Sequence, residues 1–491
     1  TTKQELQKTA SDWLTDGVYV LVVQPEEKHT FERTPLADRS KLPFPETFPK
    51  LNLPEVQRGK LSNGIDVVFA ERHDVPMINL SLLIGSGHAA DPKDNPGLAS
   101  FTMSMLREGT KRYDALQLSD KIDELGADLY TSTGLDSSSV TLSALKSNFS
   151  ESLDLMLEVI NEPTFDQTEI DRKKLRWLAS IDQSLSTPNG VVSALLPKIM
   201  YGEDHPYGKP SSGDGTRQSI QWMSRQDMVA HKEATITPAN STIVAIGDTN
   251  LEELLPILES KFGRWKTEAN QEDDMNYEVS VESSARKIYL FDKPGAIQSL
   301  IVAGQLLPAN GTDDEVDIDL MNRVIGGSFT SRLNMNLRED KSWSYGVRTR
   351  LSSRKGPRPM LVYAPVQTDR TVDSMKEIQK EYSEYLSSRP ASNEELNPIK
   401  QQIILGLNGQ FETFGSLLSG VSGIVTFDRG DDYLNAVPEK YNAVTIDQVN
   451  VATKKYLNPE TWTWFIVGDL SKIEEDIRNL GLGEVEIIVL D

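Results

Sequence analysis

The feature that most constrains this chain is an internal repeat. Residues Met228–Asp248 read as an amphipathic helix, a Pro-Ala-Asn turn and a strand that ends in Gly-Asp. Residues Val449–Asp469 repeat this order, and the residue numbers of Pro238 and Pro459 differ by 221, as do those of the two closing aspartates. Because the register holds without a gap, we predict that the chain contains two copies of one structural unit.

A second pair of segments supports the duplication. Residues 67–83 and 288–302 each read as a strand, a short polar turn and a second strand. Each is followed by a polar loop and a helix, expected at Gly97–Arg107 and Asp317–Val324. We therefore place two homologous α+β domains at residues 54–266 and 287–491, with an acidic linker at 267–286.

The first 25 residues resemble the closing part of a third copy. A helix is expected from Gln4, followed by a turn and a strand that runs to Pro25. A helix and strand without a sheet of their own cannot bury their apolar faces, so this arm at residues 1–25 must dock elsewhere. It either packs on the first domain of this chain or adds a strand to a sheet in a partner subunit. Residues 26–53, with several prolines, are expected to form an extended tether.

Charge and composition narrow the possible partners. The net charge is −22, which disfavours nucleic acids and anionic membrane surfaces and, as a weak expectation, favours basic or neutral peptides. The chain has no Cys, which excludes disulfides, thiolate metal sites and Cys nucleophiles. No apolar run approaches the ~18 residues that a membrane span needs. The chain begins without Met, so a cleaved signal peptide is compatible with it, and a periplasmic or otherwise exported location is slightly favoured.

Common catalytic motifs are absent from the sequence. No two of the five histidines stand three or four residues apart, and neither a Gly-x-Ser-x-Gly motif nor a phosphate-binding loop occurs. His205 lies in a turn-rich segment, where a structural role is expected. Gly326 and Gly327 form either a loop of backbone donors for a substrate or a tight helix entry capped by Ser328.

The helix at residues 95–110 carries a resemblance to a known family. Its Gly-Leu, Met-Leu and Gly-Thr pairs match the zinc-binding helix of the pitrilysin and mitochondrial-processing-peptidase type of zinc metallopeptidases, the inverted-motif zincins. In active members two histidines of this helix bind zinc and a glutamate is the general base. This chain has Ser100 and Ser104 at the histidine positions and Met103 at the base position, and Ser180 aligns with the third ligand. The resemblance therefore implies that this chain binds no metal and is inert alone, because neutral hydroxyls hold zinc weakly and a thioether cannot take a proton from water.

A second family element is retained. The segment Leu337–Val347 matches a family pattern in which an Arg and a Tyr stand seven residues apart, here Arg338 and Tyr345. The resemblance implies that both donate hydrogen bonds to the substrate carbonyl as negative charge develops on its oxygen. Without the resemblance, Arg338 would be read as a cation at a helix end and Tyr345 as a strand residue.

Active relatives form clamshells in which one half carries zinc and the opposite half carries the Arg–Tyr pair. By this resemblance each domain should be a mixed sheet with helices on one face, and the chain should be one half of a clamshell. We expect a non-metal subunit of a heteromeric zinc metalloendopeptidase that binds peptides and has no cofactor of its own, with zinc and the general base on a homologous partner chain. The alternative is a non-catalytic scaffold or peptide-binding core subunit of a larger assembly.

Overall fold

The structure is a computed structural model that describes residues 2–14, 17, 19–22, 50–265, 275–278 and 286–490. It divides into two compact units, Thr1–Phe48 and Pro49–Asp491, each described by itself. In the first unit, helix α1 (Lys3–Trp13) begins with a capping box between Thr2 and Glu5, and none of its side chains is buried. Residues 19–22 have exposed side chains and no assigned strand. Residues 23–49, which include most of the expected tether, lie outside the described residues.

The second unit contains two six-stranded mixed sheets. The first sheet has the strand order β1-β2-β6-β3-β5-β4, and the second has the order β12-β7-β11-β8-β10-β9. The strands of the first sheet are β1 (Val56–Lys60), β2 (Asp66–Glu71), β3 (Met77–Ile84), β4 (Asp128–Thr133), β5 (Ser138–Leu145) and β6 (Ser241–Gly247). Those of the second are β7 (Lys287–Asp292), β8 (Gln298–Leu307), β9 (Arg348–Leu351), β10 (Arg358–Gln367), β11 (Thr463–Gly468) and β12 (Glu484–Ile488).

The strand pairing confirms the repeat down to its register. In the first sheet β2 runs parallel to β6 with Asp66 opposite Thr242, and in the second β7 runs parallel to β11 with Lys287 opposite Thr463. Both members of this pair are shifted by the same 221 residues found in the sequence. The outermost strands differ, since β1 is antiparallel to β2 whereas β12 is parallel to β7.

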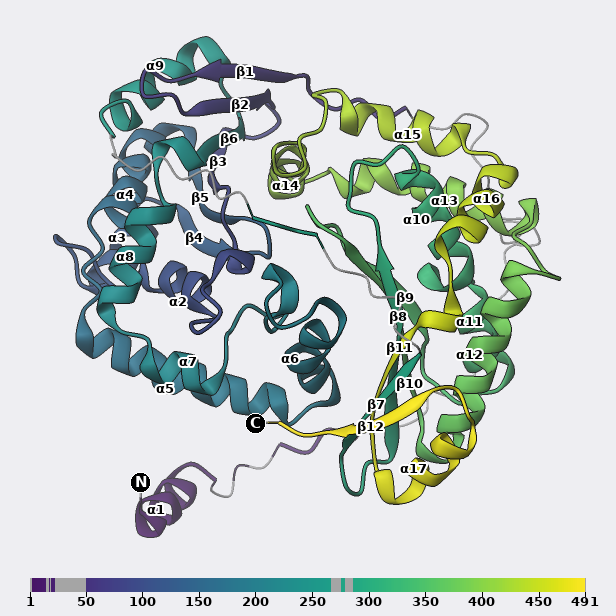
Figure 1. The fold of residues 1–491 in the computed structure, drawn as a ribbon. Coiled ribbons are helices and arrows are strands. Elements are labelled where there is room, and N and C mark those ends of the chain that lie inside the picture. The colour runs from purple at the N-terminus through teal and green to yellow at the C-terminus, as the bar shows by residue number, and fades with distance from the viewer. Residues whose placement is uncertain are drawn as a thin grey trace. The chain divides into compact units, whose positions relative to one another are not determined.

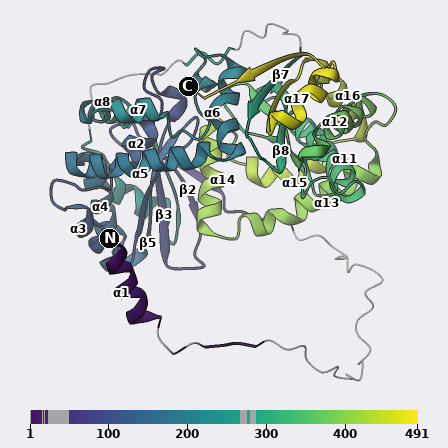
Figure 2. The same cartoon turned by 90° about the horizontal axis from the view of Figure 1, so that it is seen from below.

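Helices follow the strands in both halves (Figures 1 and 2). The first half contains α2 (Leu98–Met105), α3 (Ala115–Glu124), α4 (Phe149–Asn161), α5 (Gln167–Leu185), α6 (Pro188–Tyr201), α7 (Arg217–Trp222), α8 (Arg225–Thr235) and α9 (Leu251–Phe262). The second contains α10 (Glu315–Asn322), α11 (Arg332–Asn334), α12 (Thr371–Leu386), α13 (Asn393–Gln410), α14 (Phe414–Thr426), α15 (Tyr433–Ala443), α16 (Ile446–Tyr456) and α17 (Leu470–Asn479). The α+β fold class is confirmed. Among the described residues, no helix is both long and apolar enough to cross a membrane.

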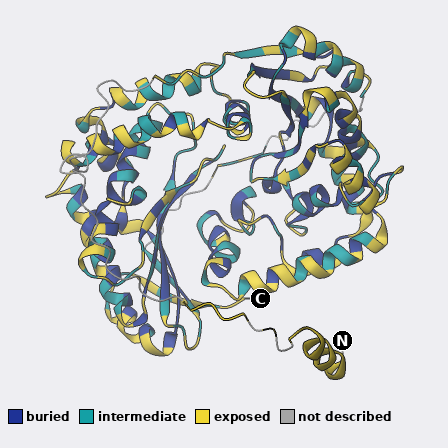
Figure 3. Cartoon of the chain, turned by 180° about the vertical axis from the view of Figure 1, so that it is seen from behind, coloured by how far each residue is buried: buried dark blue, intermediate teal, exposed yellow. Residues whose placement is uncertain are grey.

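Each sheet buries both of its faces. Alternate residues of a strand point to opposite faces, and in β2 one set, with Val67 and Phe69, joins the core beneath the helices of its own half. The other set, with Val68 and Ala70, packs against a helix that belongs to the second half. The central strands are accordingly buried, whereas β1, β4 and β12 are partly exposed and the covering helices keep exposed outer faces (Figure 3).

The two halves exchange these covering helices reciprocally. Leu417, Leu418 and Val421 of α14 pack on the first sheet. In return, Val192 and Leu196 of α6 pack on the second sheet. Helices α6 and α14 consequently lie between the two sheets (Figure 1). Helices of its own half therefore cover one face of each sheet, as expected, and a helix of the other half covers the second face.

Two short segments, one at the end of the expected tether and one within the expected linker, pack on the rest of the second unit. Leu51 and Leu53 lie against the α14 cluster, and the Leu53 N–H donates to Asn435. In the expected linker, Met275 and Tyr277 pack against a small cluster around Tyr207. Residues 267–274 and 279–285 of that linker lie outside the described residues.

Candidate functional site

Helix α2, which carries the degenerate metal motif, is positioned by a buried aspartate. Asp91 accepts hydrogen bonds from the backbone N–H groups of Gly97 and Ala99, at 2.7 and 2.8 Å. Burial raises the pKa of the Asp91 carboxyl to about 7, against the opposing effect of these hydrogen bonds and of Lys209. Gly97 has φ = 92°, and a side chain there would meet the backbone of Asp214 and Gly215, so this tight helix entry requires glycine.

The four degenerate positions do not form a metal site. Met103 is 2% exposed and belongs to the core of the first half. The Ser104 hydroxyl donates to the Phe101 carbonyl at 2.7 Å, within its own helix. Ser100 is half-buried in α2, whereas Ser180 is an exposed residue of α5. Within the described residues, no group of three or more His, Cys, Asp or Glu side chains could hold a metal ion.

Cationic side chains lie beside this motif. Lys173 of α5 donates to the Ser104 carbonyl at 2.8 Å and to a Glu108 carboxylate oxygen at 2.5 Å. Arg172 also pairs with Glu108. A divalent cation at this place would meet these positive charges as well as weak ligands, so the residues present do not fit zinc.

Arg338 and Tyr345 line one hollow in the second half, with a volume of about 510 Å³. Arg338 lies in the last turn of a short π-helix, Met335–Asp340, and its side chain is 38% exposed. Its Nε lies 3.2 Å from Glu339, and its guanidinium lies 4.8 Å from the centre of the Phe329 ring. Tyr345 is 89% exposed. It precedes β9 and is not itself a strand residue.

The turn between these two residues explains their spacing. The Ser342 N–H donates to the Arg338 carbonyl, which is the bond of an αL helix end, and the Trp343 N–H donates to the Leu337 carbonyl. Ser342 takes the left-handed conformation, φ = 56°, that glycine usually supplies there. The chain reverses within four residues, so the last helical turn and the start of the extended segment open on the same hollow.

Asn334 links the two loops that border this hollow, those of Phe329 and Val347. This residue was not identified from the sequence. It is 3% exposed, its Oδ1 accepts from the Val347 N–H at 3.1 Å, and its Nδ2 donates to the Phe329 carbonyl at 2.7 Å. A buried amide with both sides bonded fixes the two loops relative to each other. The only sequence signal for it was an Asn inside an apolar helical stretch.

The two glycines end a helix and do not open one. They close the π-helical extension of α10, Arg323–Gly327, and the Ser328 hydroxyl donates back to the Arg323 carbonyl at 3.1 Å. The helix-entry interpretation is therefore wrong. Gly327 lines the hollow, but Gly326 is buried where a Cβ would lie 2.4 Å from Thr349. Close packing against β9 thus explains Gly326.

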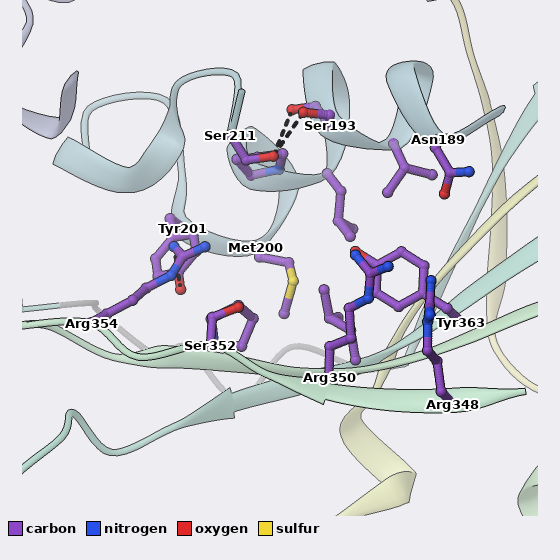
Figure 4. A pocket seen from close by; sticks show the side chains of 15 residues that line it. Asn189, Ser193, Met200, Tyr201, Ser211, Arg348, Arg350, Ser352, Arg354 and Tyr363 are labelled. Atoms are coloured by element: carbon purple, nitrogen blue, oxygen red, sulfur yellow. Dashed lines mark hydrogen bonds between the residues drawn. The ribbon is translucent and has the colours of Figure 1, made fainter. Parts of the chain in front are cut away.

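A row of arginines extends the hollow. A second hollow of about 510 Å³ lies between α6 and the second sheet and shares Asn189, Arg348 and Tyr363 with the first. Arg348, Arg350 and Arg354 line it, and in the part of the chain that the structure describes no Asp or Glu lines either hollow. Figure 4 shows these three side chains on the sheet side and Asn189 and Ser193 on the helix side. The charge along this groove is opposite in sign to the total charge from which the expectation of basic or neutral peptides was drawn, and that expectation stays a prediction.

His205 has the structural role that was expected. Its Nδ1 accepts from the Tyr207 N–H at 2.9 Å, and its Nε2 lies 3.3 Å from the Tyr277 carbonyl. These contacts fix the neutral tautomer with the proton on Nε2. Burial lowers the pKa of His205, in keeping with a neutral ring.

Comparison with known proteins shows two domains of one peptidase family. Residues 66–213 match "Insulinase (Peptidase family M16)", and residues 223–403 match "Peptidase M16 inactive domain". A protein of Helicobacter pylori named as a non-peptidase homolog is 22% identical over 398 residues, which is 80% of this chain and 88% of that protein. The beta subunit of the mitochondrial-processing peptidase of Blastocladiella emersonii is 22% identical over 219 residues, which is 44% of this chain and 45% of that protein.

A solved structure has the same fold. The M16 inactive domain from Pseudomonas fluorescens superimposes with a TM-score of 0.76 at 23% identity, covering 85% of this chain and 98% of that one. The duplicated sheets, the retained frame of the α2 motif and the loss of its ligands agree with these matches. The chain belongs to the M16, pitrilysin-like peptidase family and is a member whose own metal motif is degenerate.

Proposed function

We propose that this chain is the non-metal subunit of a heteromeric M16 peptidase and that it donates Arg338 and Tyr345 to the active site of a zinc-bearing partner chain. The observation that carries the proposal is that both side chains open on one hollow while the degenerate motif of the first half cannot bind zinc. A phenol that is 89% exposed contributes little packing energy to its own fold.

The chemistry of the two groups suits this role. The zinc and general base of the partner would activate the attacking water. On this chain, the Arg338 guanidinium and the Tyr345 hydroxyl donate hydrogen bonds to the carbonyl oxygen of the substrate, which becomes more negative as the reaction proceeds. Such donors act mainly in the transition state, so their loss lowers kcat more than it raises KM.

The test uses the complex isolated with its zinc-bearing partner. Arg338→Ala and Tyr345→Phe should each lower kcat by roughly a hundredfold to a thousandfold, or about 2.7–4 kcal/mol, with little change in KM. Arg264→Ala and Tyr130→Phe, at exposed positions of the first half, are the matched controls and should leave kcat unchanged. The isolated chain should contain no stoichiometric zinc and cleave no peptide, as measured by metal analysis and a peptidase assay.

Undiminished activity of the doubly substituted complex would refute the assigned roles. The chain would then be a scaffold or peptide-binding core subunit. Native mass spectrometry of the protein from its own cell would identify what it assembles with in either case.

A further inference from the structure

We propose that the arginine groove, defined as the hollow lined by Arg348, Arg350 and Arg354, binds acidic side chains of an extended peptide and so selects acidic substrates. This inference rests on the proposed function, because the groove continues the hollow of Arg338 and Tyr345. The inference specifies acidic peptides as the substrates of the site that contains Arg338 and Tyr345.

The charge of the groove is the first argument. Among the described residues, the guanidinium groups of Arg338, Arg348, Arg350 and Arg354 line the two connected hollows, and no carboxylate does. Among the described residues, neither Arg348 nor Arg350 forms an ion pair with an Asp or Glu. The whole chain carries 73 acidic against 51 basic residues, so this local excess of positive charge is contrary to its average. Arg338 has Glu339 beside it, whereas the guanidinium groups of Arg348 and Arg350, without such a partner, favour an anionic ligand.

The spacing of the arginines fits an extended peptide. Arg348 and Arg350 are alternate residues of β9 and are exposed on one face, while Thr349 between them is buried on the other. Alternate residues of a strand lie roughly 6.6 Å apart. An extended peptide repeats its own side chains at the same interval, so carboxylates at every second residue match the two guanidinium groups.

Aromatic rings orient two of these guanidinium groups, those of Arg350 and Arg354. Arg350 stacks over the ring of Tyr363, 4.8 Å from its centre. Arg354 donates to the Tyr201 hydroxyl at 3.0 Å and lies 5.3 and 5.0 Å from the ring centres of Tyr201 and Tyr207. A planar guanidinium that is already oriented loses less conformational entropy when it donates two hydrogen bonds to a carboxylate.

The opposite wall favours a peptide over a bare anion. It is formed by α6, which presents Asn189 and Ser193 to the groove above the arginines (Figure 4). Amide and hydroxyl groups can bond peptide backbone as donors or acceptors. A nucleic acid would bring many phosphates close to a chain of net charge −22, which opposes its approach.

The test compares three fluorescent peptides of equal length that carry Glu, Gln or Lys at alternate positions. Binding to the full chain is measured by fluorescence anisotropy. The Glu peptide should bind at least tenfold tighter than the Gln peptide and lose this advantage at high salt, because the contacts are between charges. Arg348→Gln with Arg350→Gln should weaken binding of the Glu peptide about tenfold or more and leave the Gln peptide unchanged.

The control makes the same change of charge elsewhere. Arg112 and Arg264 are exposed residues of the first half that do not line the groove, so Arg112→Gln with Arg264→Gln should leave the preference intact. Circular dichroism verifies that each variant is folded. Equal binding of the Glu and Gln peptides, equal effects of the two double substitutions, or stronger binding of a single-stranded oligonucleotide than of the Glu peptide would each overturn the proposal.

A kinetic comparison in the complex separates this inference from the proposed function. The groove substitutions should raise KM for the Glu peptide and leave kcat unchanged, whereas Arg338→Ala should lower kcat. If only the first effect appears, the arginine groove stands and the role of Arg338 fails. If only the second appears, the role of Arg338 stands and the selection of acidic peptides fails.

Discussion

One hydroxyl group joins the two halves through buried contacts, and its removal is a direct test of how they are held together. Tyr207 is 1% exposed and belongs to the first half. Its hydroxyl donates to Asp136 Oδ1 at 2.6 Å and accepts from the Gly356 N–H, in the β9–β10 loop of the second half, at 3.0 Å. Asp136 also accepts from the Lys355 N–H of that loop at 3.1 Å. Burial, with the nearby carboxylate, raises the pKa of Tyr207, so the hydroxyl stays protonated.

The expected cost of Tyr207→Phe follows from these contacts. A hydrogen bond to a charged group contributes about 1.5–3 kcal/mol, and a buried N–H without a partner costs about 1–3 kcal/mol. Asp136 is 6% exposed and keeps only its bond to Lys355, so solvent replaces little of what is lost. Allowing for relaxation of the loop, we expect the free energy of unfolding to fall by about 3 kcal/mol.

Urea unfolding followed by circular dichroism measures this change. Tyr130→Phe is the matched control, because Tyr130 is 47% exposed, and it should stay within about 0.5 kcal/mol of the native protein. Hydrogen exchange should show that both sheets lose protection together. A Tyr207→Phe protein within 0.5 kcal/mol of the native value would refute the reasoning, and so would a loss confined to one sheet.

Two further predictions concern the interface helices and a buried histidine. Leu196→Ala in α6 and Leu418→Ala in α14 should each lower the free energy of unfolding by about 2–5 kcal/mol in a single transition, and two separate transitions in calorimetry would contradict this. Burial, with Lys209 and Arg354 nearby, lowers the pKa of His88 to about 4. The unfolded chain therefore binds a proton first as the pH falls from 6.5 to 4, and stability is lost over that range. The free energy of unfolding of the native protein exceeds that of a His88→Gln variant by an amount that should shrink by up to about 3 kcal/mol between pH 6.5 and 4. Urea titrations at several pH values measure this difference, and a difference that is independent of pH would contradict the prediction.

The repeat could be predicted from the sequence because its helix, turn and strand each have a local residue pattern. The Pro-Ala-Asn turn near Pro238 and its counterpart at Pro459 both form short 3-10 turns ahead of a central strand. The common shift of 221 residues then reappears as the pairing of β2 with β6 and of β7 with β11. The family motif named Arg338 and Tyr345 from their spacing of seven residues. The structure adds that the helix ends between them and that both line one hollow.

Features that depend on long-range packing escaped prediction. The apolar stripe of α6 shows that it packs on something, but nothing local shows that Leu196 packs on the sheet of the other half. Gly326 was interpreted either as part of a loop of backbone donors or as a helix entry, because its contact with Thr349 joins residues on separate elements and has no local signal. The arginine groove was missed because total charge was counted without its placement, although the Arg-Thr-Arg alternation at residues 348–350 indicates one charged strand face.

The reciprocal exchange of helices explains how the first half can lose its metal ligands and still be required. Helix α6 belongs to the first half, yet it buries Val192 and Leu196 on the second sheet and forms the wall opposite the arginines. Tyr201, at the end of α6, orients Arg354, and its own hydroxyl donates to the Pro357 carbonyl at 2.7 Å. A first half that lost its fold together with its ligands would remove this wall and release Arg354. Replacement of the zinc ligands by Ser100 and Ser104 leaves these contacts untouched, so chemistry can be lost from α2 while the shape of the groove beside Arg338 and Tyr345 is kept.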